Sequence, residues 1–295
     1  MFEKILVPTD FSGSAKKTLE CISRFPQVHE IILLHIVDAT HYSRHGWIHE
    51  PHVEKAKILL EEEKELLEKW GLTVQTRVQV ITNGEVYMAI LDLAEKEKVS
   101  LIVMGSRGRG LIQGLLLGSV SAGVLRHGKA HLMIIRHMVL EEITEKNFDR
   151  FCPGILSRVL FPTDFSPPAV AALTLLKKME GLEEVILLHV ISRGETQEEI
   201  HLLIEEAKEK FDMLKKDLTD SGLLVRTHVR LGRPPDEINH LAEEAGVSMI
   251  VMSAHGKNMF QEMLLGSTTL GTAIHAKKPL LVLRSRPKPE PGSAG

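Results

Sequence analysis

The segment Val7-Pro8-Thr9-Asp10-Phe11-Ser12 recurs in the second half of the 295-residue chain as Phe161-Pro162-Thr163-Asp164-Phe165-Ser166. The apolar run Ile31-Ile32-Leu33-Leu34-His35 likewise recurs as Val185-Ile186-Leu187-Leu188-His189, at the same spacing of 154 residues. The chain therefore contains two copies of one unit, and comparing the copies separates what the unit needs from what one copy can vary.

Two further segments show that the second copy is shorter. Met104-Gly105-Ser106-Arg107-Gly108 corresponds to Met252-Ser253-Ala254-His255-Gly256, and Leu117-Gly118-Ser119 corresponds to Leu265-Gly266-Ser267, now at a spacing of 148 residues. A unit of about 140–150 residues has the usual size of one domain. We expect a first domain over residues 1–137, a linker over 138–157, a second domain over 158–286 and a disordered, Pro- and Gly-rich tail over 287–295.

Short apolar runs alternate with amphipathic stretches in both copies. Runs such as Ile31–Leu34 and Leu101–Met104 are apolar on both faces, which is typical of parallel strands covered by helices on both sides. The expected strands are Lys4–Pro8, Glu30–Val37, Val74–Ile81, Ser100–Gly105, His131–Arg136, Arg158–Pro162, Glu184–Ile191, Leu224–Leu231, Ser248–Ser253 and Pro279–Arg284. The expected helices of the first copy are Ser14–Phe25, Val53–Trp70, Glu85–Glu97 and Ser119–His127. The pattern predicts an α/β protein of two tandem doubly wound (Rossmann-like) domains, each with a five-stranded parallel sheet. Gly71 and Gly222 follow the long second helices, where a left-handed C-cap is expected.

The composition is that of an ordinary globular protein, with 43% hydrophobic and 25% charged residues. A net charge of −3 gives no reason to expect a nucleic-acid or membrane-surface partner. No apolar run reaches the roughly 18 residues of a transmembrane helix, and the N-terminus leads into a strand rather than a signal peptide. Cys21 and Cys152, the only cysteines, lack metal-type spacing and indicate a reducing cytoplasm. Scarce Asn beside plentiful Glu and Lys is a weak indication of a thermophilic source.

Polar and glycine residues gather where the predicted strands end. Asp10 and Asp164 follow the first strand of each copy, Gly105 and Gly108 follow the fourth, and Gly118 precedes the last helix. Open α/β sheets bind ligands beyond the carboxyl ends of their strands. Glycines allow close approach of the backbone to a phosphate, and a helix N-terminus attracts an anion. Ser119, expected as the N-cap, would add a hydroxyl to the same phosphate.

This spacing, Gly-x2-Gly-x9-Gly-Ser, resembles the motif of the universal stress protein family, specifically its ATP-binding branch in a tandem two-domain form. The resemblance covers Met1 to about Arg136 and Arg158 to about Arg284. It implies an adenine nucleotide, ATP or AMP, with Mg²⁺ accompanying a triphosphate. It further implies that strand-1 residues lie beside ribose and phosphates, that second-strand backbone reads the adenine edge, and that the glycine loop holds the phosphates. The positions implied are Pro8, Thr9, Asp10, Ile36, Val37, Gly105, Arg107, Gly108, Gly118, Ser119 and Val120. Those of the second copy are Pro162, Thr163, Asp164, Val190, Ile191, Ser253, His255, Gly256, Gly266, Ser267 and Thr268.

The second copy departs from the motif at Ser253, which stands where the first glycine belongs. A Cβ there is expected to crowd the ligand or to force a different φ. Because the other motif positions and Asp164 remain, we still expect the second site to be occupied.

Each of these signals has a simpler structural interpretation. The glycine motif is also compatible with a tight turn that packs helix against strand without a ligand. Asp10 is also a residue type that forms turns after strands, although its return as Asp164 favours a site. His35 and His189 end apolar runs and are better interpreted as satisfied core or edge histidines than as catalytic bases. The histidines of segment 41–52 (His41, His45, His49 and His52) suggest a metal site, but Gly46 and Pro51 argue against the helix it needs; a flap carrying Tyr42 or Trp47 is the more plausible role.

Three functions compete: a nucleotide-binding regulatory module, a slow ATP hydrolase or nucleotidyl-transfer enzyme, and a ligand-free dimerisation scaffold. The chain has no Gly-x4-Gly-Lys-Ser/Thr loop and no carboxylate–histidine pair placed by the sequence as a base for water, so binding is favoured over catalysis. The last strand of each copy, His131–Arg136 and Pro279–Arg284, is an apolar edge that tends to pair. The family resemblance implies that these strands pair with each other and make the chain an internal pseudo-dimer; a further homodimer is left open.

Overall fold

The computed structural model describes residues 2–23, 25, 28–40, 49–106, 117–136, 152–256 and 265–284. Most of the expected linker and the expected tail 287–295 lie outside these ranges.

Each unit repeats a strand–helix alternation. The first unit consists of β1 (Lys4–Pro8), α1 (Gly13–Ile22), β2 (Glu30–Asp38), α2 (His49–Glu68), β3 (Thr73–Ile81), α3 (Val86–Lys96), β4 (Leu101–Gly105), α4 (Ser119–His127) and β5 (His131–Ile135). The second consists of β6 (Arg158–Pro162), α7 (Pro167–Leu176), β7 (Glu184–Ile191), α8 (Gln197–Thr219), β8 (Leu224–Leu231), α9 (Pro234–Glu244), β9 (Met249–Ser253), α10 (Ser267–His275) and β10 (Leu280–Leu283). The predicted strand boundaries agree with these to within one residue.

The strands of both units form one sheet in the order β3-β2-β1-β4-β5-β10-β9-β6-β7-β8. Neighbouring strands within a unit are parallel, whereas β5 and β10 are antiparallel, with Leu281 opposite Met133. The predicted class, two tandem doubly wound α/β domains, is confirmed.

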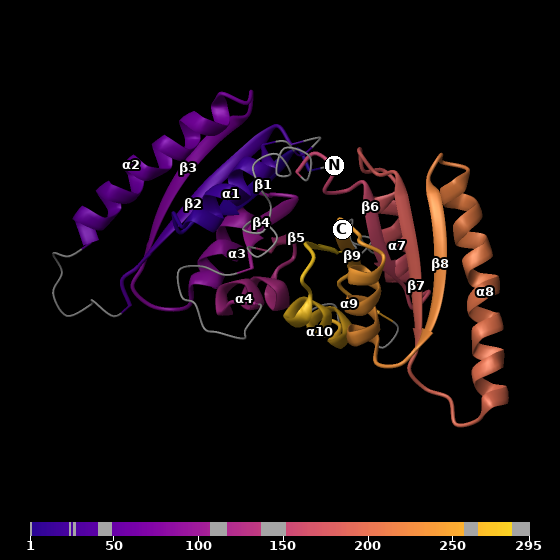
Figure 1. Cartoon of the computed structure of the whole chain (residues 1–295). Coiled ribbons are helices and arrows are strands. Elements are labelled where there is room, and N and C mark those ends of the chain that lie inside the picture. The colour runs from indigo at the N-terminus through magenta and orange to yellow at the C-terminus, as the bar shows by residue number, and fades with distance from the viewer. Residues whose placement is uncertain are drawn as a thin grey trace, which may run out of the picture.

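Helices cover both faces of the sheet (Figure 1). One apolar cluster joins the sheet to α1, α2, α7 and α8, and the other joins it to α3, α4, α9 and α10. Both clusters contain residues of β5 and β10, so each core runs through the boundary between the units. Because Ile31–Leu34 of β2 are 0% exposed, their unbroken apolar run is explained by burial on both faces.

Glycines fix two features of the helices. Gly71 and Gly222 have φ of +81° and +86°, which confirms the left-handed conformation expected after α2 and α8. At Gly123 of α4 a Cβ would lie 2.4 Å from the Tyr87 ring of α3, so the two helices touch at a position that only glycine permits. Among the described residues, no helix is both long and apolar enough to cross a bilayer.

Cys21 and Cys152 form a disulfide, so they are not the free thiols that the expectation of a reducing compartment assumed. Both residues are buried, and their Cα atoms lie 5.0 Å apart. The bond ties α1 of the first unit to the segment that leads into β6, and closes a loop of 131 residues. Chain-entropy arguments give a disulfide that closes so long a loop a stabilisation of about 5 kcal/mol.

We therefore expect Cys21→Ser/Cys152→Ser to lower the free energy of unfolding by about 2–5 kcal/mol, measured by urea unfolding. Reduction of the wild-type protein should have a similar effect, and the reductant should not change the double variant. Equal unfolding free energies for oxidised and reduced wild-type protein would contradict a stabilising role for the bond.

Candidate functional site

The turn after the first strand has the same geometry in both units. In the second, the Thr163 hydroxyl accepts from the Phe165 N–H at 3.0 Å, and Asp164 Oδ1 accepts from the Ser166 N–H at 3.0 Å. Ser166 then caps α7 by accepting from the N–H of Ala169. The segment Thr9–Ser12 makes the equivalent bonds.

Phenylalanine occupies a left-handed conformation at the centre of each turn. Phe11 has φ of 60° and Phe165 has φ of 61°, a region that residues with a Cβ seldom adopt. Backbone strain of this kind is held by surrounding bonds and clusters at functional sites. Asp10 and Asp164 are thus turn formers, as the simpler interpretation proposed, but the turn they form also fixes the direction of their carboxylates.

The histidine at the end of each second strand contacts this turn. His189 Nδ1 lies 2.8 Å from the Thr163 carbonyl oxygen, and His35 Nδ1 lies 2.8 Å from that of Thr9. The His189 ring also packs against the Phe165 ring, with centroids 4.7 Å apart. The interpretation of both histidines as satisfied residues is confirmed.

The last helix of each unit is bonded to the end of the fourth strand. The Gly266 N–H donates to the Ala254 carbonyl at 2.9 Å, and the Thr269 hydroxyl donates to the Ser253 carbonyl at 2.9 Å. In the first unit the corresponding bonds run from Gly118 to Ser106 at 2.8 Å and from Ser121 to Gly105 at 3.0 Å. These bonds hold the N-terminus of the helix beside the strand end.

The expectation that Ser119 is an N-cap is wrong. Gly118 is the N-cap, with an extended backbone (φ −75°, ψ 161°), and its carbonyl accepts from the Ala122 N–H at 2.9 Å. Ser119 is the first helical residue, and Ser267 has the same place after Gly266 in the second unit. The glycine N-caps leave the first N–H groups of α4 and α10 without intrahelical acceptors, next to the positive end of the helix dipole.

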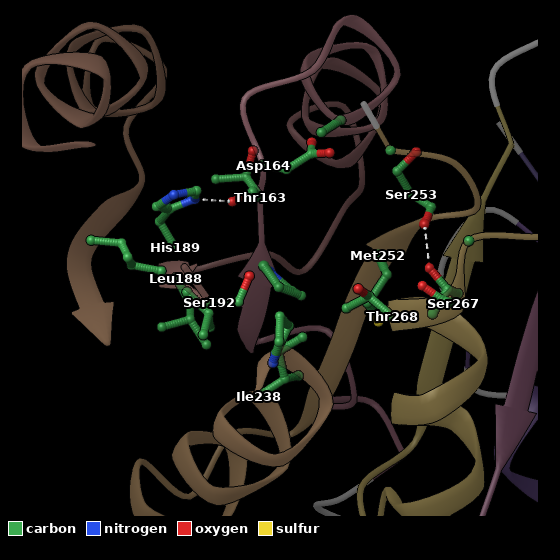
Figure 2. Close-up of a pocket in the computed structure, with 18 of the residues that line it drawn as sticks. Thr163, Asp164, Leu188, His189, Ser192, Ile238, Met252, Ser253, Ser267 and Thr268 are labelled. Carbon is green, nitrogen blue, oxygen red and sulfur yellow. Dashed lines mark hydrogen bonds between the residues drawn. The ribbon is translucent and has the colours of Figure 1, made fainter. Parts of the chain in front are cut away.

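In the second unit these elements enclose a cavity of about 490 Å³ (Figure 2). Asp164 comes from the strand-1 turn, Val190 from the end of β7, and Ser267 and Thr268 from the start of α10. Every second-unit position that the sequence predicted lines this cavity: Pro162, Thr163, Asp164, Val190, Ile191, Ser253, His255, Gly256, Gly266, Ser267 and Thr268.

Sequence reasoning missed other residues that line the cavity. Apolar walls come from Leu203 of α8 and from Pro234 and Ile238 of α9, which the motif does not include. Arg193, just after β7, also lines it and makes no ion pair or hydrogen bond with another described residue. Arg193 could have been found from the sequence, because it is a basic residue close behind the second strand of its unit. The first unit has Ala39 at the matching position.

Ser253 does not distort the second site. It is the last residue of β9 and has no positive φ, and neither does Gly105 in the first unit. The Ser253 hydroxyl accepts from the His255 N–H at 3.3 Å. The expectation that a Cβ here forces a different φ is therefore wrong, because the strand end does not require a glycine conformation. The alternative, that this Cβ crowds the ligand, stays a prediction.

The two remaining motif glycines of the second unit, Gly256 and Gly266, differ in whether the surrounding residues require glycine. A Cβ on Gly256 would lie 2.6 Å from Asp164 Oδ2, so glycine lets the loop approach the aspartate. A Cβ on Gly266 would lie 3.4 Å from its nearest neighbour, the Ala254 carbonyl oxygen, which is an ordinary contact. Among the described residues, none comes close enough to require glycine at position 266.

The first site is described in part. Pro8, Thr9 and Asp10 lie at the end of β1, Ile36 and Val37 at the end of β2, and Gly105 at the end of β4. Gly118, Ser119 and Val120 begin α4 as their counterparts begin α10. Arg107 and Gly108 lie outside the described residues, as do the histidine-rich residues 41–48; their predicted roles stay predictions. The described residues contain no cluster of His, Cys, Asp or Glu suited to a metal ion.

A buried carboxyl group distinguishes the first site. Glu63 of α2 is 8% exposed and accepts from the Thr9 hydroxyl at 3.3 Å. The pKa of Glu63 is raised to about 7, chiefly by burial and in part by the nearby Asp10, against the Thr9 hydrogen bond and Lys16, which lower it. Leu214 has the matching place in α8, so this acid belongs to the first unit alone.

Comparison with known proteins identifies the class to which this fold and site belong. The model of the universal stress protein family matches residues 1–136 and 156–284, which together make up most of the chain. The chain therefore belongs to the universal stress protein family, with two copies of its domain in tandem.

Relatives occur in one-domain and tandem forms. A universal stress protein of Methanocaldococcus jannaschii is 38% identical over 154 residues, which cover 44% of this chain and 95% of that protein. One from Mycolicibacterium smegmatis is 25% identical over 311 residues, covering 96% of this chain and 97% of that protein. The crystal structure of a universal stress protein from Archaeoglobus fulgidus has a TM-score of 0.71 and 27% identity, covering 95% of this chain and 96% of that chain.

The raised pKa of Glu63 predicts a pH-dependent contribution to stability. The folded protein keeps a proton on Glu63 between its usual pKa of 4.5 and about 7, whereas the unfolded chain releases it. Folding therefore binds a proton in this range, and the free energy of unfolding falls as pH rises, by at most about 3 kcal/mol. Urea unfolding at pH 5 and pH 8 should show this loss in wild-type protein but not in Glu63→Gln.

The exposed neighbour Glu62 provides the control, because Glu62→Gln should keep the wild-type pH dependence. Identical pH dependences in wild type and Glu63→Gln would show that Glu63 is ionised throughout the range.

Proposed function

We propose that this protein is a nucleotide-binding regulatory member of the stress-response family, and that each unit binds an adenine nucleotide. The observation that carries the proposal is the second-unit cavity, where Asp164, the start of α10 and the end of β7 converge. Its volume of about 490 Å³ is within the range of small-molecule sites.

The chemistry of the cavity suits a phosphate at one end. The first N–H groups of α10, at Ser267 and Thr268, present donors and a helix dipole to an anion. Arg193 adds a positive charge to the lining of the cavity. Gly266 leaves room for the close approach of a phosphate to the helix.

The other end suits a flat base. β6 ends opposite Leu188 of β7, whose carbonyl accepts the last cross-strand bond, from the Thr163 N–H at 2.8 Å. Because alternate residues of a strand direct their backbone groups to the same neighbour, Val190 presents an N–H and a C=O that β6 does not reach. One donor and one acceptor at this spacing complement the adenine edge. Ile36 has the same place in the first unit, since Thr9 donates to Leu34 at 2.9 Å.

The remaining parts of the proposal concern setting and assembly. Domains over 1–137 and 158–286 acting as an internal pseudo-dimer are supported by the β5–β10 pairing. A cytoplasmic location is compatible with the Cys21–Cys152 disulfide if the source is hyperthermophilic, because intracellular proteins of such organisms are rich in disulfides. ATP with Mg²⁺, or AMP, is the proposed ligand.

The first test is to denature the purified protein and identify released nucleotide by chromatography and mass spectrometry. We expect an adenine nucleotide at close to two molecules per chain if both sites retain it. Where purification strips the ligand, calorimetric titration with ATP, ADP and AMP replaces this measurement. Absence of binding to all three would favour the ligand-free scaffold, and single-turnover release of phosphate would favour the hydrolase.

Substitution of the glycine N-caps and of the strand-1 aspartates tests whether these residues contribute to ligand binding. Gly266→Ala should weaken binding at the second site roughly ten- to hundredfold, the equivalent of losing one charge-assisted hydrogen bond, without lowering the melting temperature. Asp10→Ala and Gly118→Ala should each weaken the first site in the same way.

Gly13→Ala is the matched control, because a Cβ there meets nothing within 4 Å and should leave the affinity unchanged and not lower the stability. Unchanged affinities in folded Gly266→Ala and Gly118→Ala would contradict the assignment of the glycines to the ligand.

A further inference from the structure

Two buried arginines reach from one unit into the other. Arg136, the residue after β5, is 3% exposed, and its Nη2 donates to the Ala273 carbonyl of α10. Arg284, the residue after β10, is 9% exposed, and its Nη2 donates to the Leu125 carbonyl of α4 at 2.6 Å. Arg136 and Arg284 are 148 residues apart, which is the repeat spacing, and so are their acceptors Leu125 and Ala273. The two contacts are therefore reciprocal copies of one interaction across the unit boundary.

The acceptors are carbonyls that the helices themselves leave unpaired. Leu125 and Ala273 lie in the last turns of α4 and α10, where carbonyls have no intrahelical donor. The preceding carbonyls are already used, since Val124 accepts from Gly128 at 2.9 Å and Thr272 from Ala276 at 2.7 Å. A guanidinium at this end also complements the negative pole of the helix dipole.

The opposite end of each helix is the proposed phosphate site. α4 and α10 have 9 residues each, so their N- and C-termini are only about 13 Å apart. A helix this short, bonded at its start to a strand end, transmits a displacement from one end to the other.

The residue before each arginine pairs with the strand end at the proposed nucleotide site of the same unit. Leu283, which precedes Arg284, pairs with Ser253 and accepts from the Ala254 N–H at 2.9 Å. Ile135, which precedes Arg136, pairs with Gly105 and accepts from the Ser106 N–H at 2.9 Å. Each arginine thus joins the strand end of one site to the helix of the other.

We propose that Arg136 and Arg284 are positioning residues that couple the two nucleotide sites, so that occupancy of one changes the affinity of the other. The inference rests on the proposed function. A phosphate that shifts the start of α4 moves the Leu125 carbonyl, and Arg284 carries this movement to the end of β9 beside the second site. Arg136 acts in the opposite direction through α10, and thermodynamic linkage makes the coupling equal in both directions.

Burial makes these contacts hard to exchange for water. Burial lowers the pKa of Arg284 to about 10, which still leaves the guanidinium charged at neutral pH. A buried charge that loses its acceptor is strongly destabilised, so Arg284 is expected to follow the Leu125 carbonyl rather than release it.

The backbone of Arg284 makes a further hydrogen bond across the unit boundary. The Arg284 N–H donates to His131 Nδ1 at 2.9 Å, whereas the matching residue in the second unit is Pro279, whose side chain has no acceptor. Arg284 is therefore tied to the first unit by backbone as well as side chain.

Calorimetric titration of the full chain with MgATP tests the coupling. Asp164→Ala and Asp10→Ala give the affinity of each site when binding at the other is weakened, and the intact protein gives the stepwise affinities. We expect at least one affinity to differ about fivefold or more between the two measurements, the lower range of allosteric coupling. In Arg136→Met/Arg284→Met both sites should bind independently, with affinities close to those of the single-site variants.

Hydrogen exchange tests in solution whether each arginine holds the helix of the other unit. Arg284→Met should speed exchange in α4 of the first unit, and Arg136→Met in α10 of the second, in each case in the unit that does not contain the substitution. Arg126→Met, which removes an exposed arginine from α4, is the matched control and should preserve coupling. If a methionine variant does not fold, Arg284→Lys, which keeps the charge but loses the planar donor geometry, replaces it and should reduce coupling.

The outcomes separate the two proposals. Two sites that bind with their single-site affinities in the intact protein, or coupling that survives the loss of both arginines, would overturn the inference and leave nucleotide binding in place. No binding of MgATP to the intact protein would overturn the proposed function and the coupling with it.

Discussion

The antiparallel pairing of β5 with β10 is the constraint on which the rest of the molecule depends. Both strands are almost completely buried and apolar on both faces, and an edge of this kind left open would offer unpaired backbone groups to any other chain. Pairing the two edges removes this liability and fuses two five-stranded sheets into one of ten strands. It also makes each apolar core continuous between the units and brings Arg136 and Arg284 within reach of the opposite helices.

Within each unit, the proposed ligand site depends on a strained turn. A left-handed phenylalanine costs on the order of 1–3 kcal/mol. In both units the strain is offset locally, by the threonine and aspartate side chains that accept backbone N–H groups and by the ring contact with a histidine. The same set of contacts aims Asp164 at the glycine loop, where Gly256 makes room for Oδ2. Identical geometry in the two copies indicates that the turn is a requirement of the site rather than an accident of one sequence.

Features that depend on the local residue pattern could be predicted from the sequence. Features that depend on a contact between residues far apart in the chain could not. Strand boundaries followed from unbroken apolar runs, because burial on both faces leaves a direct trace in composition. The family resemblance and the repeat together named residues that line the second-unit cavity. The Cys21–Cys152 bond could not be predicted, because only the folded chain brings together residues separated by 131 positions. Ser119 was misplaced by one residue because serine is a common N-cap, and the strand-end bond that fixes Gly118 in that place involves Ser106. The contacts of Arg136 and Arg284 could not be predicted either, because they too join residues that only the folded chain brings together.

Three differences between the copies lie around the proposed sites and at the boundary between the units. Glu63 faces the first-strand turn where the second unit has Leu214; Arg193 stands at the second site where the first unit has Ala39; and His131 holds Arg284 where the second unit has Pro279. Each change adds or removes a charge, a titratable group or a hydrogen bond within a fold that the repeat keeps constant. Two sites with the same framework but different charge near the ligand are expected to differ in affinity. If the reciprocal arginines couple them, the tighter site would set the response of the weaker, which two separate single-domain proteins cannot do.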